Sequence, residues 1–475
     1  MMKRTILSLA LCLNVPLPAA SKPNILFIIA DDASLHFGAA YDCSWVKTPH
    51  IDRLAKQGLV FTNAYTPTAK CAPSRSAILT GRNPWQLGAA ANHQPIFPPQ
   101  YKAFTEAVHN AGCHTGSLGK TWGPGEALTT EGKPRDWGMA KCDFQKFLST
   151  RPKDAPFFYW FGSANPHRPY KPGAEIAAGE RLAAIQRVPA IWPDIDTVRN
   201  DMLDYAAEIE AFDAEVGDHL KALEESDEAE NTLIIVTSDN GMPFPRSKGH
   251  NYDISNHLPL IACWPNGIKN PGRRVDELIS FIDFAPTFLE ILGMDAAKSG
   301  MSRITGQSFT DLLRDKPEHD RSRVILGRER NDLNARPGTE SGLGYPIRAI
   351  REGKLLYLHN FTPDRWPCGN PELELKDTDK GPTKNWIEGL GENNPFWQLA
   401  FGKRPKEELY DIKADPDCLN NLATHAEHRT DVLSLRGKLM TELKKQGDPR
   451  VLGQGDAFDN YPGRKNSASA KKEKK

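Results

Sequence analysis

"PNILFIIADD", residues 23–32, holds the clearest indication of fold class in this chain of 475 residues. Its apolar run is almost continuous, which is typical of a strand buried on both faces of a parallel sheet. Asp31 and Asp32 come directly after that strand. Because ligands of open α/β sheets bind beyond the carboxyl ends of the strands, we expect the functional site at this edge.

Helices and strands alternate outward from this strand to about residue 315. Thr48 stands where it would cap a short helix that ends at Gly58. Further helices are expected over 74–80, 102–112 and 198–226, and further strands over 59–65, 113–120, 156–163 and 231–241. This alternation predicts an α/β domain in which helices flank a mainly parallel sheet.

The pattern changes from residue 322, where short apolar stretches alternate with polar turns. We expect a smaller domain with an antiparallel sheet there, interrupted by an ordered insertion rich in Pro, Gly and Trp. The predicted organisation is a signal peptide at 1–20, a catalytic α/β domain at 21–321, an α+β subdomain at 322–445 and a disordered tail at 446–475.

Charge and hydropathy exclude some classes of protein. The chain has 60 basic and 60 acidic residues, so no overall charge favours a nucleic-acid partner. Lys3 and Arg4, a short apolar run and the small residues Ala19 and Ala20 are typical of a secretory signal removed near residue 20. We find no other candidate membrane span. The mature protein is therefore expected to be exported, either to the periplasm or out of the cell.

Two strand ends supply oxygen ligands for a metal ion. Asp31 and Asp32 follow the first strand, and Asp239 and Asn240 follow the strand that begins near residue 231. Three carboxylates and an amide favour Ca²⁺ or Mg²⁺ over zinc, because no histidine or thiolate joins them. The alternative is that these are two unrelated turns, since "DNG" is a common turn sequence.

Cys71 opens the stretch "CAPSRSAILTGR", residues 71–82. Pro73 suits the first turn of a helix, so Cys71 is expected at or just before a helix N-terminus. The free N–H groups and the dipole there favour an anion, and Arg75 lies one turn further on. A stabilised thiolate and a cysteine nucleophile are therefore one interpretation. A buried structural cysteine is the other.

These residues resemble the type I sulfatases of the alkaline-phosphatase-like superfamily. The signature of that family is Cys-x-Pro-Ser-Arg followed by Thr-Gly-Arg, and it stands here as Cys71, Pro73, Ser74, Arg75, Thr80, Gly81 and Arg82. Similar segments include "NILFIIADD", "TPHIDRLAKQGLVFTNAY", "TSDNG", "FIDFAPTFLEILG", "GQSFTDLL" and "ELYDIKADPDCLNNLA". The resemblance covers nearly the whole mature chain and implies the fold of that superfamily.

The resemblance also implies the chemistry of Cys71. In this family the cysteine is oxidised by a formylglycine-generating maturation enzyme, and the hydrated aldehyde attacks the sulfur of a sulfate ester or sulfamate. Its second hydroxyl then expels sulfate and restores the aldehyde. By resemblance, one Ca²⁺ would be held by Asp31, Asp32, Asp239 and Asn240, with residue 71 as a further ligand.

The other site residues are assigned by resemblance alone. Arg75 would hold the diol, Lys120 and Lys248 would contact sulfate oxygens, and His167 would protonate the leaving group. Arg246 and His250 lie close enough in sequence to compete with Lys248.

One departure from the family concerns the residues after Lys120. Many members have a histidine two residues after this lysine, whereas Thr121 and Trp122 follow it here. The missing histidine usually holds a diol oxygen, and His250 or His93 are the candidates to replace it.

The segments "DNGMPFP" and "YPIRAIREGKLLYLHNF" resemble the branch that contains heparan N-sulfatase. The expected substrate is a sulfated glycan, with N-sulfoglucosamine as the first specific expectation. The candidate sugar-binding residues are His93, Arg168, Arg348, Trp366 and Trp386. Salt bridges at the surface or between domains are the alternative for the two arginines, and anchoring of the insertion is the alternative for the two tryptophans. The alternatives are an O-sulfatase for another polysaccharide such as an algal one, a catalytically impaired glycan-binding homologue, and a phosphatase or phosphodiesterase of the same superfamily.

Overall fold

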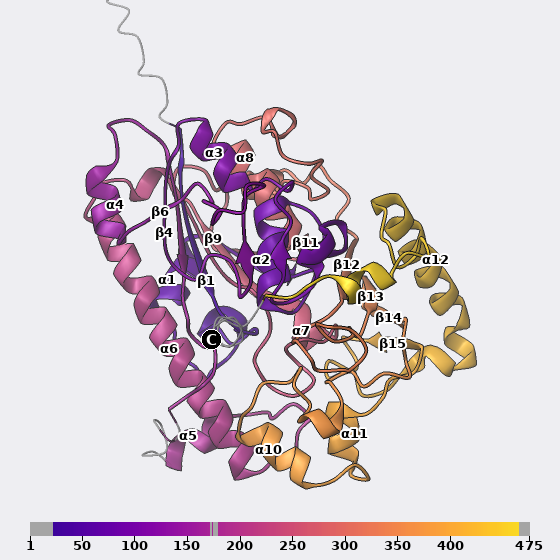
Figure 1. Ribbon diagram of the computed structural model, residues 1–475. Coiled ribbons are helices and arrows are strands. Elements are labelled where there is room, and N and C mark those ends of the chain that lie inside the picture. Colours follow the sequence, from indigo (N-terminus) through magenta and orange to yellow (C-terminus); the bar gives the residue numbers. More distant parts are fainter. Residues whose placement is uncertain (1–21, 172, 174–178, 465–475) are drawn as a thin grey trace, which may run out of the picture.

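A computed structural model describes residues 22–171, 173 and 179–464. A nine-stranded sheet forms the centre of the larger domain (Figure 1). Its strand order is β10-β2-β9-β8-β1-β7-β4-β6, with β11 paired to β2. The strands are β1 (Asn24–Ala30), β2 (Leu59–Tyr65), β4 (His114–Gly119), β6 (Ala140–Lys141), β7 (Phe157–Gly162), β8 (Thr232–Ser238), β9 (His257–Cys263), β10 (Arg273–Val275) and β11 (Ile279–Ser280). Every pairing is parallel except those of β9, so the predicted mainly parallel sheet is confirmed.

Strand β1 is buried on both faces, as its sequence predicts. Leu26 and Ile28 belong to one apolar core, together with α1 (Pro49–Gln57), α4 (Phe144–Thr150) and α6 (Asp196–Glu224). Ile25, Phe27 and Ile29 belong to the core on the opposite face, together with α2 (Cys71–Thr80), α3 (Phe104–Asn110) and α8 (Phe284–Ile291). Side chains alternate between the two faces of a strand, so this strand joins both cores.

The N-terminus of α1 shows one wrong prediction. Thr48 makes no capping hydrogen bond with its side chain. Instead, the carboxylate of Asp213 on α6 accepts hydrogen bonds from the backbone N–H groups of His50 and Ile51, at 3.2 and 2.8 Å. The free N–H groups of a helix start need an acceptor, and here tertiary packing supplies it. A local sequence pattern cannot reveal such a distant partner.

The smaller domain contains a four-stranded antiparallel sheet, as predicted, in the order β12-β13-β14-β15. The strands are β12 (Arg323–Arg328), β13 (Ile347–Glu352), β14 (Leu355–Asn360) and β15 (Glu407–Asp411). Helix α12 (Arg429–Gln446) lies beside this sheet (Figure 1). Its Leu435 and Leu439 join an apolar core with residues of the sheet. The insertion between β14 and β15 forms α10 (Pro382–Gly389) and α11 (Pro395–Phe401), and its Ile387 and Trp397 join the core around α6.

The chain beyond α12 differs from the expected disordered tail as far as residue 464. Residues 447–464 include α13 (Asp456–Asn460), whose Phe458 is buried against the small domain. Arg450 donates to Glu329 at 2.7 Å. Residues 465–475 and the predicted signal peptide lie outside the described residues. The remaining short elements are β3 (Ile96–Phe97), β5 (Glu126–Ala127), α5 (Gly179–Ala184), α7 (Asp253–Asn256) and α9 (Thr310–Leu313).

None of the helices in the described part of the chain has the length and apolar character that crossing a membrane requires.

Candidate active site

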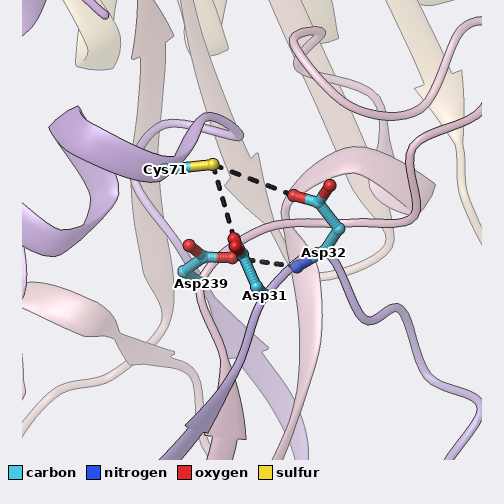
Figure 2. Close-up of side chains that lie close together, drawn as sticks. All are labelled: Asp31, Asp32, Cys71 and Asp239. Carbon is cyan, nitrogen blue, oxygen red and sulfur yellow. Dashed lines mark hydrogen bonds between the residues drawn. The ribbon is translucent and has the colours of Figure 1, made fainter. Parts of the chain in front are cut away.

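The register of the central sheet brings the predicted acidic residues together. Ala30 of β1 lies beside Ser238 of β8 in a parallel pair, so Asp31 and Asp239 follow at the same level of the sheet edge. The backbone N–H of Asp32 donates to Asp239 Oδ1 at 3.1 Å. Neighbouring strand ends therefore hold three carboxylates in one place (Figure 2).

These carboxylates surround the side chain of Cys71. One ligand atom from each of Asp31, Asp32, Cys71 and Asp239 lies within 4.8 Å of the others, and all four residues are buried. The Cys71 Sγ is 3.5 Å from Asp31 Oδ1 and 3.9 Å from Asp32 Oδ1 (Figure 2). The helix α2 begins at Cys71 and so delivers the residue to the strand ends.

The side chain of Asn240 completes the oxygen cluster. Its amide Nδ2 donates to Asp32 Oδ1 at 2.7 Å and to the carbonyl of Gly241 at 3.0 Å. Its Oδ1 is buried and has no hydrogen-bond partner among the described residues. A buried oxygen without a donor is costly unless a cation or an ordered water binds it. Three carboxylates and this amide oxygen are the hard donors that Ca²⁺ or Mg²⁺ prefers, so the residues fit a divalent cation.

The surroundings of Cys71 favour the second of the two interpretations of the unmodified residue, a buried cysteine with a neutral thiol, over a stabilised thiolate. Burial raises the pKa of the Cys71 thiol, although Lys120 and Lys248 act in the opposite direction. Asp31 and Asp239 raise this pKa further. Desolvation and neighbouring carboxylates both disfavour an anionic sulfur, and here they outweigh the two lysines.

Lys120 and Arg75 hold the carboxylates from the side of β4 and α2. The Lys120 Nζ is 2.6 Å from both oxygens of Asp31. Arg75 is fully buried, donates to Asp239 Oδ2 at 2.7 Å and also donates to the carbonyl of Lys120. The close approach of β4 to β7 makes this possible, because a Cβ on Gly162 would lie 1.7 Å from the Lys120 carbonyl oxygen.

Lys248 reaches the cluster from the loop after β8. Its Nζ is 2.6 Å from Asp32 Oδ2 and 3.2 Å from Asp379 Oδ2. Burial lowers the pKa of Lys248, but Asp32 and Asp379 outweigh burial and raise this pKa well above its ordinary value. Arg246, two residues earlier, donates instead to the carbonyls of Leu399 and Cys418.

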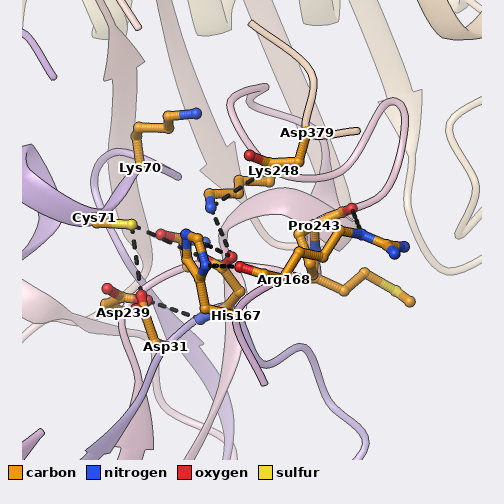
Figure 3. A network of polar contacts seen from close by, with 12 residues as sticks. Asp31, Lys70, Cys71, His167, Arg168, Asp239, Pro243, Lys248 and Asp379 are labelled. Atoms are coloured by element: carbon orange, nitrogen blue, oxygen red, sulfur yellow. Dashed lines mark hydrogen bonds and ion pairs between the residues drawn. The ribbon is translucent and has the colours of Figure 1, made fainter. Parts of the chain in front are cut away.

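His167 and His250, two of the three histidines considered for the site, lie in different surroundings. His167 is the more exposed, with 39% of its side chain accessible, and its Nε2 is 3.9 Å from Asp32 Oδ2 (Figure 3). Its Nδ1 lies 2.5 Å from the carbonyl of Arg168. His250 is buried with its Nε2 3.4 Å from Cys368 Sγ.

The arginines and tryptophans expected to bind sugar make internal contacts. Arg168 donates to Asp201 at 2.8 Å. It also donates to the carbonyl of Pro243 at 3.0 Å (Figure 3). Arg348 is completely buried between Asp448 and Glu329, at 2.7 and 2.8 Å. Trp366 packs edge-on against Trp397, and Trp366 and Trp386 both pack against the core around α6. None of these contacts joins the carboxylate cluster.

Comparison with known proteins agrees with this geometry. The model of the family described as Sulfatase matches residues 23–127 and 142–294, which is more than half of the chain. The chain belongs to the sulfatase family. It is accordingly a sulfate ester hydrolase, with the fold that we expected from the resemblance.

Several curated relatives of this sulfatase are similar over most of their length. An N-acetylgalactosamine-6-O-sulfatase from Bacteroides thetaiotaomicron is 41% identical, over 85% of this chain and 90% of its own. The N-sulphoglucosamine sulphohydrolase of Homo sapiens is 27% identical, over 93% of this chain and 94% of its own. An ulvan-active sulfatase from Formosa agariphila is 28% identical, over 92% of this chain and 77% of its own.

Solved structures share the fold. One of them was determined in complex with its substrate D-glucosamine-2-N,6-O-disulfate; it has a TM-score of 0.63 and 21% identity and covers 90% of this chain and 98% of its own. A phosphonate monoester hydrolase from Agrobacterium radiobacter has a TM-score of 0.61 and 19% identity, over 91% of this chain and 97% of its own. At such identities the likeness shows the fold alone.

The sequence analysis missed three charged residues beside the site of this sulfatase. Lys70, just before Cys71, donates to Asp332 Oδ2 at 2.9 Å. Asp332 also lies 3.1 Å from the Nδ1 of His93, which places His93 next to this group. Asp379 contacts Lys248, as described above. The adjacency of Lys70 to Cys71 was a usable signal, whereas Asp332 and Asp379 come from loops of the small domain and carry no local pattern.

Proposed function

We propose that this sulfatase removes sulfate from a sulfated glycan, with a formylglycine formed at residue 71 as the nucleophile and a divalent cation, calcium first, beside it. One observation supports this most directly. Asp31, Asp32, Asp239 and Cys71 converge within 4.8 Å, and the free oxygen of Asn240 is buried beside them. Asp31, Asp32, Asp239 and Asn240 would hold the cation, with residue 71 as a further ligand.

The neutral thiol of Cys71 also supports a modified residue. A buried thiol with a raised pKa is a poor nucleophile. The hydrated formylglycine would supply a hydroxyl nucleophile, and the cation would stabilise the negative charge that develops in the transition state. The rest of the chemistry belongs to the side chains around residue 71.

Four side chains would orient and stabilise the reacting groups. Arg75 fixes Asp239 and the carbonyl of Lys120, so it would keep the ligand cluster in place. Lys120 and Lys248 reach the cluster from β4 and from the loop after β8, and would donate to sulfate oxygens. His167 is partly exposed and lies 3.9 Å from Asp32, so its Nε2 would give a proton to the departing oxygen or nitrogen.

The names of the relatives support a sulfated sugar as the substrate. Their names include an N-sulphoglucosamine sulphohydrolase and sulfatases for N-acetylgalactosamine 6-sulfate, N-acetylglucosamine 6-sulfate and ulvan. We take N-sulfoglucosamine as the first substrate to test and a 6-O-sulfated hexosamine as the second. We further propose that the protein is exported, and that a formylglycine-generating enzyme acts on the segment from Cys71 to Arg75.

The decisive experiment measures free sulfate released from a panel of sulfated saccharides. Mass analysis of the peptide that contains residue 71 must first show formylglycine, and Cys71→Ala protein is the control. Release by the wild type and its loss in the control are expected. Hydrolysis of a phosphate monoester and of a phosphonate monoester is followed in parallel by release of their alcohol, because a phosphonate monoester hydrolase shares this fold. No release from any member by matured protein would contradict the proposal and favour a glycan-binding homologue.

A further inference from the structure

Two carboxylates of the small domain contact lysines beside the site. Asp332 follows β12, and Asp379 lies in the insertion before α10. Their side chains are 21% and 25% accessible, whereas those of Lys70 and Lys248, which they contact, are only 2% and 3% accessible. The carboxylates therefore form the outer layer here and the ammonium groups the inner layer.

The two lysines are neutralised by these carboxylates. Lys70 is 2.9 Å from Asp332. Lys248 is 3.2 Å from Asp379 (Figure 3). Lys248 also contacts Asp32 at 2.6 Å. Lys70 and Lys248 therefore each have an acidic partner. A ligand group that approaches the carboxylates from outside meets acceptors of negative charge.

His93 adds an observation that points to a ligand. Its side chain is 7% accessible, and its Nδ1 lies 3.1 Å from Asp332 Oδ1. Its Nε2 is buried and has no partner among the described residues. A buried ring nitrogen without a hydrogen-bond partner is costly. In a neutral imidazole, Nε2 can either donate or accept a hydrogen bond, depending on the tautomer.

Asp377 fixes both carboxylates to the small domain. Its Oδ1 accepts the backbone N–H of Asp332 at 2.8 Å, and it stands two residues before Asp379. Its Oδ2 accepts from Arg336 at 2.6 Å and from Arg328 at 3.2 Å. The loop after β12 and the insertion are therefore joined at one buried group, which pre-positions Asp332 and Asp379.

We propose that Asp332, Asp379 and His93 form the subsite for the sulfate-bearing sugar ring and select a ring that presents hydroxyl or amino hydrogens rather than a carboxylate. Carboxylates accept hydrogen bonds from several ring hydroxyls and repel a uronate placed against them. The preferred substrate is then a sulfated neutral or amino hexose. This inference rests on the proposed function, and it names the part of the substrate beyond the sulfate group.

The test separates recognition of the sugar from recognition of sulfate. For the wild type, we expect kcat/KM for a sulfated hexosamine to exceed that for iduronate 2-sulfate by at least ~10-fold. Asp332→Asn and Asp379→Asn should each raise KM for the hexosamine by about 10-fold and reduce the discrimination against the uronate. Inhibition by inorganic sulfate, which occupies only the sulfate end, should change by less than about twofold if Lys248 keeps its contact with Asp32.

Asp311→Asn is the matched control. Asp311 is a buried carboxylate, 7% exposed and 3.2 Å from Arg321, and it lies outside the site. Thermal unfolding of all variants shows whether loss of an ion pair has only reduced the stability of the fold. Asp379→Glu keeps the charge and should therefore retain more activity than Asp379→Asn. Equal losses for hexosamine and inorganic sulfate, or for the Asp311 variant, would overturn the inference.

Calorimetry on Cys71→Ala protein distinguishes failure of this inference from failure of the proposed function. This protein cannot form formylglycine, so binding is measured without turnover. Weaker binding of the sulfated hexosamine in the Asp332 and Asp379 variants would support the subsite even if the wild type released no sulfate. Unchanged binding would refute the subsite even if the wild type were an active sulfatase.

Discussion

The two ends of the candidate site are built in different ways. The sulfate end consists of residues at strand ends and at the start of α2, whose positions follow from the sheet register. The sugar end consists of His93, Asp332 and Asp379, which come from three loops, two of them in the small domain. The register of a sheet is rigid, so it suits chemistry that many substrates share. Loops vary more easily, so they suit the recognition of one particular sugar.

Removing the divalent cation should have the largest effect, and it addresses the sulfate end only. Excess chelator should reduce sulfate release by ~10³-fold or more, because the charge that develops on the reacting oxygens would lose its main stabilisation. Added Ca²⁺ should restore activity. Metal analysis and thermal unfolding provide readouts that do not depend on turnover, since a bound ion stabilises the folded state.

The control for this prediction is the pair Asp239→Asn and Asp311→Asn. Only the first should abolish the calcium-dependent rise in melting temperature. Full activity in chelator, with negligible metal in the protein, would contradict the prediction. The carboxylates would then only form ion pairs with the two lysines and the arginine.

Replacing Lys248 or Arg246 by Ala tests which of these two residues in the loop after β8 acts in the site. Lys248→Ala should lower kcat/KM by about 10²-fold, comparable to the loss of a transition-state donor. Arg246→Ala should reduce stability instead, because the carbonyls of Leu399 and Cys418 lose their buried donor. Steady-state kinetics and thermal unfolding of both variants check this, and the opposite ranking in kcat/KM would place the functional contact at Arg246.

The sequence was sufficient to predict the residues at strand ends. An apolar run followed by Asp31 and Asp32, and another followed by Asp239, can be recognised because strand burial and chain order are local properties. The helix that begins at Cys71 follows from Pro73 in the same way. The fold class and the antiparallel small domain are confirmed on this basis.

Partners that are distant in sequence could not be predicted. Arg348 looked like a possible ligand group, but it is completely buried between Asp448 and Glu329. The choice between a thiolate and a buried neutral thiol at Cys71 could not be made from the sequence either, because helix position is local whereas burial and the neighbouring carboxylates depend on the whole fold. Asp332 and Asp379 acquire their positions only when Asp377 joins the two loops.

Replacing His93 by Gln should have the smallest effect and sharpens the contrast between the two ends. Burial lowers the pKa of His93 from its ordinary value of 6.5, although Asp332 acts in the opposite direction. His93 is therefore neutral above pH 6.5, and KM should be constant from pH 6.5 to 8 as far as this residue is concerned. Gln is also a neutral donor and acceptor, so we expect only a small effect. KM should rise about threefold, which corresponds to the loss of one net hydrogen bond, and kcat should be unchanged.

The pH profile distinguishes this role from replacement of the histidine that is missing after Lys120. If His93 held the nucleophile, His93→Gln would lower kcat more than it raises KM, and the pH dependence of kcat would change. If it contacts the sugar, the pH dependence of kcat stays that of the wild type. The same residue thus reports whether the loops of the small domain select the substrate only or also take part in the chemistry at residue 71.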